Sequence, residues 1–203
     1  MAKEKLKKPK LTKEQQKEVF VLTPAFKVSW PQVFTAKSFK EGDKPKFSIT
    51  MLFKSKDDLK ELIRAEKNAL KHQFGPDPKR WPKEYKRPFE QGDPEFQHEK
   101  GYIKVRASTT FAPQVLDQRK NQLREEDNQF YAGCMARATL MANYWKSPLG
   151  QGVNFYLQNL QKVGDGERIG GGPSAQDQFG EIEDGSDSSD SYDEDEVVDE
   201  IFS

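Results

Sequence analysis

In Lys46-Phe-Ser-Ile-Thr-Met-Leu-Phe-Lys54, apolar and polar side chains alternate except at Leu52, so that one face of the segment is apolar. A period of two is typical of a β-strand with one buried face. Directly after it, Ser55 and Asp58 have the spacing of a helix-capping pair, and apolar residues then recur at helical spacing as far as Phe74. Gly75 ends this pattern. The sequence therefore predicts a strand followed at once by a helix.

Strand patterns dominate the rest of the chain. Further strands are predicted at 26–30, 102–108, 114–117, 131–145 and 152–163. Five or six strands with one early helix indicate a mainly β fold, either a small barrel or a curled antiparallel sheet. The connection 75–101 shows no convincing periodicity, and so long a loop inside a compact domain is usually functional or disordered.

Charge divides the chain into a cationic body and an anionic tail. The whole chain holds 33 basic and 33 acidic residues, but residues 176–203 hold twelve of the acidic ones and no Lys or Arg. The remainder has 33 basic against 21 acidic residues, a net charge of +12. A body of this charge attracts polyanions, and an anionic tail on the same chain competes with them.

Composition predicts four segments along the chain. Residues 1–18 form a disordered basic arm, 19–163 a folded domain, 164–175 a Gly-rich linker and 176–203 a disordered acidic tail, because the outer segments have too few apolar residues to pack. No apolar run approaches the roughly 18 residues that cross a bilayer, and no apolar stretch follows the basic start. We therefore expect a soluble, cytoplasmic protein.

Residues suited to catalysis or metal binding are sparse. His72 and His98 are the only histidines, and with the single Cys134 they cannot form a zinc site of familiar spacing. Cys134 lies in an apolar run and is expected to be buried. The glycines of 164–173 lack the Gly-Lys-Ser/Thr of a phosphate loop. We expect neither a cofactor nor an enzymatic activity.

The densest cluster of basic and aromatic side chains lies in the loop 79–89. Cations there could follow the phosphates of a single strand while flat rings stack on its bases. The DNA-binding candidates in this loop are Lys79, Arg80, Trp81, Lys83, Tyr85, Lys86 and Arg87. In the alternative interpretation, Trp81 and Phe89 pin the loop to the core and leave a solvated charged rim.

The polar faces of three predicted strands supply further candidates. They are Lys46 and Lys54 on one strand, Tyr102, Lys104 and Arg106 on the second, and Tyr156 on the third. A half-buried sheet always has a polar face, so the alternative is that these side chains are merely solvated. Trp30 and Phe34 are interpreted as core or barrel-end residues rather than as platforms for bases.

The end of the acidic tail returns to apolar residues, including Ile201 and Phe202, which a docking peptide needs and a solvating tail does not. A barrel with a Gly-rich linker, an acidic tail and a near-terminal Phe resembles the single-stranded DNA-binding proteins of tailed phages and bacteria. In better-known relatives the tail ends on Phe itself, whereas here Ser203 follows Phe202.

The body resembles one phage family of single-stranded DNA-binding proteins over residues 20–172. The segments that carry the resemblance occur in order along the chain, and they are 26–34, 44–53, Trp81-Pro82 followed by Phe89 and Gly92-Asp93, 113–117, 131–137 and 152–163. The resemblance implies the oligonucleotide-binding (OB) fold. It does not specify which side chains contact DNA.

The sequence thus predicts an OB-fold-like barrel of five or six strands, with one helix after the second strand. It would bind single-stranded DNA without sequence specificity in phage replication or recombination. Its tail would compete with DNA and dock partner proteins through Ile201 and Phe202, with no membrane contact and with a homodimer left open. The alternatives are an acidic-tailed chaperone for basic proteins and, further behind, a metal-dependent nuclease.

Overall fold

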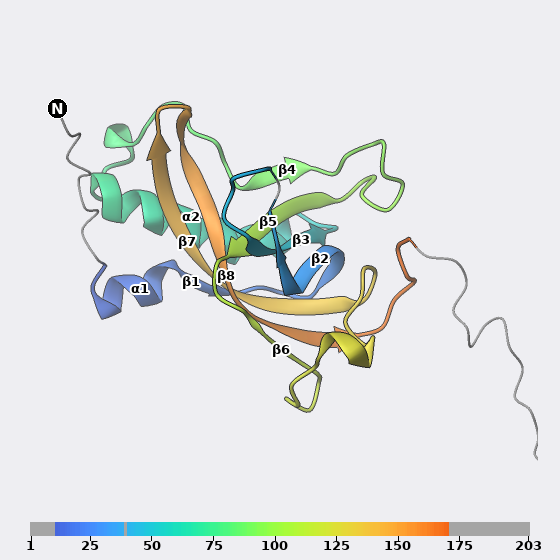
Figure 1. Ribbon diagram of the computed structural model, residues 1–203. Helices are drawn as coiled ribbons and strands as arrows, with labels where there is room; N and C mark the ends of the chain where they lie inside the picture. Colours follow the sequence, from blue (N-terminus) through green and yellow to red (C-terminus); the bar gives the residue numbers. More distant parts are fainter. Residues whose placement is uncertain (1–10, 39, 171–203) are drawn as a thin grey trace, which may run out of the picture. The chain divides into compact units, whose positions relative to one another are not determined.

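The computed structural model describes residues 11–38 and 40–170 (Figure 1). Eight strands form one sheet in the order β1-β7-β2-β3-β5-β8-β6, with β4 paired to β5. The strands are β1 (Phe20–Leu22), β2 (Phe26–Lys37), β3 (Lys46–Phe53), β4 (Phe89–Gln91), β5 (Ile103–Thr109), β6 (Gln114–Leu116), β7 (Met135–Ser147) and β8 (Gly150–Gly164). Two α-helices, α1 (Lys13–Val19) and α2 (Lys60–Phe74), accompany them.

Five of these strands close into a ring. β2 pairs with β3, β3 with β5, β5 with β8 and β8 with β7, and β7 returns to β2. All of these pairings are antiparallel except that of β5 with β8. Closure of a sheet in this way satisfies the edges of its strands and produces a barrel. The prediction of a mainly β, barrel-like fold with its main helix after the strand at 46–53 is confirmed.

The sheet contains two strands that the sequence did not predict, β1 and β4. Each has only three residues, too few for a period of two to be recognised. β4 lies within the long connection 75–101 and pairs with β5, so part of that connection belongs to the sheet. The predicted helix begins with a 3₁₀ turn at Asp57–Leu59 before α2, with Asp58 accepting a hydrogen bond from the Ser55 N–H.

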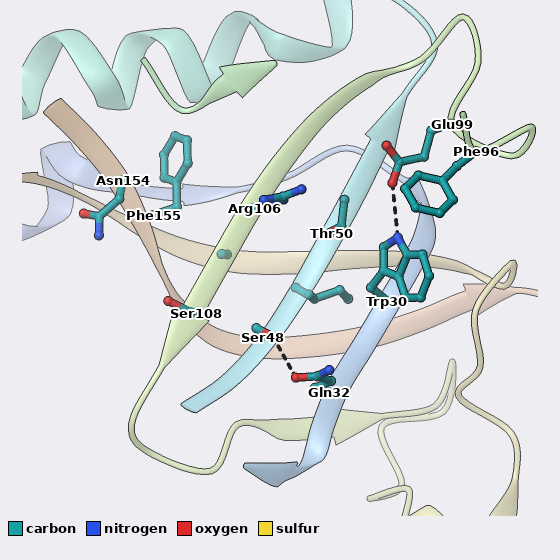
Figure 2. Close-up of a pocket in the computed structure, with 12 residues that line it drawn as sticks. Trp30, Gln32, Ser48, Thr50, Phe96, Glu99, Arg106, Ser108, Asn154 and Phe155 are labelled. Atoms are coloured by element: carbon teal, nitrogen blue, oxygen red, sulfur yellow. Dashed lines mark hydrogen bonds between the residues drawn. The ribbon is translucent and has the colours of Figure 1, made fainter. Parts of the chain in front are cut away.

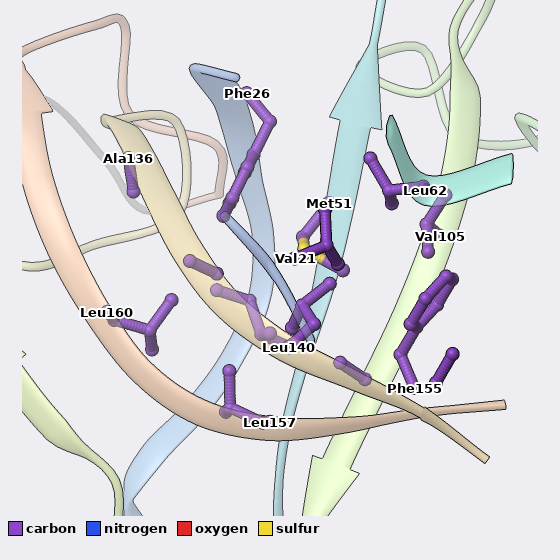
Figure 3. Packing of buried hydrophobic residues seen from close by; sticks show 14 of the residues in the cluster. Val21, Phe26, Met51, Leu62, Val105, Ala136, Leu140, Phe155, Leu157 and Leu160 are labelled. Atoms are coloured by element: carbon purple, nitrogen blue, oxygen red, sulfur yellow. The ribbon is translucent and has the colours of Figure 1, made fainter. Parts of the chain in front are cut away.

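Buried side chains from β2, β3, β5, β7 and β8 fill the barrel, and α2 adds Leu62 to this core (Figure 3). Phe26, Phe53 and Phe155 are among the largest fully buried residues. The rings of Phe26 and Phe53 lie 5.7 Å apart. Such a core gives the barrel a fixed outer surface on which functional side chains can be held.

At its N- and C-terminal ends, the part of the chain that the structure describes extends beyond the predicted domain 19–163. Residues 13–18, predicted to belong to the disordered arm, are helical, because Thr12 and Gln15 form a capping box. Residues 164–170, predicted to be linker, are fastened to the barrel by a hydrogen bond from the Ile169 N–H to the Ala132 carbonyl. The Arg168 guanidinium also lies 4.0 Å from the centre of the Tyr131 ring. The remaining arm and the acidic tail lie outside the described residues.

Cys134 is buried and free, as predicted. Burial raises the pKa of its thiol, so little thiolate forms near neutral pH. Among the residues that the structure describes, no helix is both long and apolar enough to cross a membrane.

Candidate nucleic-acid interface

The outer face of β2, β3, β5 and β8 is hollowed into a groove of about 550 Å³ (Figure 2). Polar side chains of β2, β3, β5 and β8 lie in it beside apolar and aromatic ones, and Arg106 of β5 is among its lining residues. The residues that line it are Trp30, Gln32, Ser48, Ile49, Thr50, Phe96, Glu99, Arg106, Ala107, Ser108, Asn154 and Phe155. We call this hollow the central groove.

Strand register explains the polar side chains of the groove. Thr50 lies opposite Arg106 and Ser48 opposite Ser108 across β3 and β5, and Gln32 lies opposite Ser48 across β2 and β3. Directly opposed residues share a face, so the polar positions of three strands coincide outside the barrel while their apolar neighbours fill it. Arg106 is exposed, and no ion pair links it to another described residue. A flexible cation beside polar side chains can approach a phosphate at little cost in desolvation.

Two further hollows adjoin the central groove and share lining residues with it. One, of about 230 Å³, shares Arg106 and Asn154 and is also lined by Lys86, Arg87 and Trp145. The other, of about 580 Å³, shares Ser108 and Asn154. Through these shared residues the three hollows adjoin one another, and Lys46, Lys86, Arg87 and Arg106 contribute cations to them.

Aromatic rings are exposed at both ends of this surface. Phe111 and Tyr156, which line the third hollow together with Lys46, are 81% and 42% exposed. Trp30, at the opposite end of the central groove, is 52% exposed. Exposed rings offer flat faces on which unstacked bases can stack.

A β-bulge turns Trp30 out of the barrel. Between Ser29 and Gln32 the register of β2 against β3 slips by one residue, and Trp30 has a φ of +47°. The left-handed region is unfavourable for a bulky side chain, and such residues concentrate at functional sites. Pro31 is tolerated because the bulge removes the need for its missing N–H.

The structure therefore corrects the interpretation of Trp30 as a core or barrel-end residue. Its indole lies against Phe96, with ring centres 5.4 Å apart and nearly perpendicular planes. Its Nε1–H donates to Glu99 Oε1 over 3.2 Å. Phe34, interpreted in the same way, does pack against the core and meets the Phe130 ring.

Glu99 is a buried carboxylate beside the central groove. Burial alone would raise its pKa, but hydrogen bonds from the Asp93 N–H, the Lys104 ammonium and the Trp30 indole together hold the pKa below its ordinary value. The carboxylate therefore stays ionised at neutral pH, with Lys104 as its counter-ion at 3.1 Å.

Three side chains of the predicted 79–89 cluster make contacts within the fold. The Trp81 indole donates to the Gly75 carbonyl over 2.9 Å. Tyr85 and Arg87 both bind Glu66, a fully buried carboxylate of α2, over 3.2 Å from the Tyr85 hydroxyl and 2.8 Å from Arg87 Nε. Burial first, and then the Glu66 carboxylate, raises the pKa of Tyr85.

The predicted DNA-binding residues therefore fall into two groups. Those that line the three hollows are Lys46, Lys86, Arg87, Arg106 and Tyr156. Those that line none of these hollows are Lys54, Lys79, Arg80, Trp81, Lys83, Tyr85, Tyr102 and Lys104. Ile201 and Phe202 lie outside the described residues.

Sequence reasoning missed several groove residues: Trp30, Gln32, Ser48, Thr50, Phe96, Ser108, Phe111 and Asn154. Most are polar residues, whose shared position on one face appears only when strand register brings them together. The Trp-Pro pair within a strand was the available signal for Trp30, because Pro inside a sheet marks a bulge or an edge.

Residues 19–192 match the family model described as Enterobacter phage Enc34, ssDNA-binding protein. The search of curated proteins found no match.

Solved structures with a similar fold include two of the single-stranded DNA-binding protein from bacteriophage Enc34. The one in complex with ssDNA has a TM-score of 0.65 and 20% identity, covering 76% of this chain and 91% of that one. Another has a TM-score of 0.60 and 21% identity, covering 80% and 90%. Gp2.5, the single-stranded DNA-binding protein encoded by bacteriophage T7, has a TM-score of 0.51 and 12% identity, covering 80% and 98%. At these identities the likeness establishes the fold.

Proposed function

This chain belongs to the Enterobacter phage Enc34 ssDNA-binding protein family, and from that membership we propose that it is a non-catalytic protein that holds single-stranded DNA across the hollowed face of its barrel. The strand would run over the central groove, with phosphates near Arg106 and bases against Trp30. The observation that carries this proposal is the exposed Trp30 together with an exposed Arg106 that forms no ion pair with another described residue, both lining one groove. OB folds bind oligonucleotides on the corresponding strands.

Weak sequence preference is expected from the chemistry of the face. Rings stack on any base, since every base has a π-face, and cations bind phosphates that carry no sequence information. Phe111, Tyr156 and Lys46 would extend the track beyond the central groove, and Lys86 would extend it on the other side. By covering exposed single strands in this way, the protein would act in phage replication or recombination, in the host cytoplasm.

We further propose that the acidic tail competes with DNA for this face and recruits partner proteins. The support is the charge division of the sequence, with twelve acidic residues in 176–203 against a body of net charge +12. DNA would displace the tail and free Ile201 and Phe202 for docking.

The test of the binding proposal is fluorescence anisotropy of a labelled poly-dT oligonucleotide at several salt concentrations, competed with duplex of equal length. We expect binding that weakens steeply with salt and resists duplex competition, because phosphate contacts and base stacking act together. Absence of binding, with and without the tail, would contradict the proposal and favour a chaperone of basic proteins.

Arg106→Gln is expected to weaken poly-dT binding. The fall of log K with log salt should also become less steep by about 0.7, the value for loss of one phosphate contact on a single strand. Lys79→Gln is the matched control, since Lys79 is another exposed cation and lines none of the three hollows. An equal change of slope in both variants would indicate diffuse attraction rather than a contact in the groove.

Deletion of residues 176–203 is expected to tighten poly-dT binding at low salt and to weaken binding of partner proteins, because it removes twelve competing negative charges. The difference should vanish at high salt, where surface charges are screened. Equal affinity of both forms at low salt would rule out competition by the tail.

A further inference from the structure

We propose that Glu99 and Lys104 are positioning residues, whose buried ion pair fixes Trp30 and Phe96 as the wall against which a DNA base stacks. This inference rests on the proposed function. It gives Lys104 a role different from the phosphate contact predicted from sequence, and it gives a carboxylate a supporting role in binding a polyanion.

Glu99 joins three parts of the chain. Its Oε1 accepts the Trp30 indole N–H, 3.2 Å away on β2. Its Oε2 accepts the backbone N–H of Asp93 over 3.0 Å and the Lys104 ammonium of β5 over 3.1 Å. Glu99 is only 1% exposed, so none of these bonds competes with bulk water. The carboxylate thus links β2, β5 and the loop between β4 and β5.

The loop that carries Phe96 is built around the same residue. The Phe96 N–H donates to the Asp93 carbonyl, the Glu99 N–H to the Phe96 carbonyl, and the Tyr102 N–H to the Glu99 carbonyl. A side chain at Gly92 would lie 1.9 Å from the Glu99 carbonyl oxygen, so the loop closes tightly over this point. The position of Phe96 therefore depends on that of Glu99.

Lys104 has no access to DNA in this arrangement. It is 7% exposed, and its ammonium is paired with the Glu99 carboxylate. A buried carboxylate without a counter-ion would be strongly unfavourable, so the Lys104 ammonium stabilises the ionised Glu99 in its buried position. Figure 2 shows the result: the Glu99 carboxylate points to the Trp30 indole, and Phe96 lies beside it at the end of the groove.

Simple electrostatics and positioning predict opposite results for Glu99→Gln. Removing a negative charge near bound phosphates should tighten binding, whereas loosening the aromatic wall should weaken it. We expect poly-dT affinity to fall by about five- to tenfold, part of the loss that a missing base stack causes. The salt slope should stay unchanged, because no phosphate contact is lost. Lys104→Met is the second variant, and it should behave in the same way. If its salt dependence instead became less steep by about 0.7, Lys104 would contact a phosphate.

A double-mutant cycle with Trp30→Gly separates positioning from general loss of structure. If Glu99 acts through Trp30, Glu99→Gln weakens the wild-type protein but has little further effect in the Trp30→Gly background. Equal weakening in both backgrounds, or tighter binding by Glu99→Gln, would overturn the inference while leaving the proposed function intact. If Trp30→Gly and Arg106→Gln themselves leave poly-dT binding unchanged, the proposed binding site fails, and this inference fails with it.

Discussion

Trp30→Gly is expected to weaken single-stranded DNA binding by about 5- to 150-fold, the equivalent of about 1–3 kcal/mol for one stacked base. The indole is half exposed at the end of the central groove and is held by Glu99 and Phe96. Stability should change little, because two effects oppose each other. The ring contacts are lost, but glycine adopts the φ of +47° without the strain that a tryptophan suffers there.

This result is measured by anisotropy with poly-dT and by thermal unfolding of the same samples. Trp81→Phe is the matched control, since Trp81, unlike Trp30, was predicted from the sequence to contact DNA, but its indole donates to the Gly75 carbonyl and lines no part of the three hollows. It should lose some stability and retain its affinity. If Trp81→Phe lost affinity and Trp30→Gly did not, the bases would stack on the 79–89 loop instead of in the groove.

The barrel could be predicted because its long strands repeat with a period of two and its helix carries capping and ending signals. The period of two in the sequences of β3 and β5 is visible in each segment in isolation, although β3 buries every residue from Ile49 to Phe53. The closure of five strands into a ring was not visible in any one segment. It depends on the pairing of β7 with β2, which joins residues far apart in the sequence, in addition to the hairpin of β7 with β8.

The candidate site was harder to predict for a specific physical reason. Charge and aromatic content identify residues that could contact DNA, but they do not reveal which cations already have a buried partner. Glu66 binds Arg87, and Glu99 binds Lys104, and both carboxylates come from other segments of the chain. Arg106, by contrast, was predicted and does reach into the groove, because its opposite neighbour on β3 is the small Thr50.

Arg87→Met is expected to destabilise the protein by about 3 kcal/mol, the low end of the range for breaking a buried ion pair. Glu66 is fully buried, and Arg87 donates to both of its oxygens. Without the guanidinium, the carboxylate keeps only the Tyr85 hydroxyl as a side-chain partner. The effect lies at the low end because the Arg87 side chain is 49% exposed, so water can enter where it stood. Urea denaturation measures the difference.

Two comparisons separate the structural role of Arg87 from a contact with DNA. Lys86→Met removes the neighbouring cation, which is 70% exposed, and should leave stability nearly unchanged while lowering the salt slope of poly-dT binding. Combining Arg87→Met with Glu66→Leu should recover most of the lost stability, because an apolar pair leaves no buried charge without a partner. If the double variant were no more stable than Arg87→Met, the cost would come from lost packing of the Arg87 stem over Phe89, 5.1 Å from its guanidinium, and the carboxylate would not be its cause.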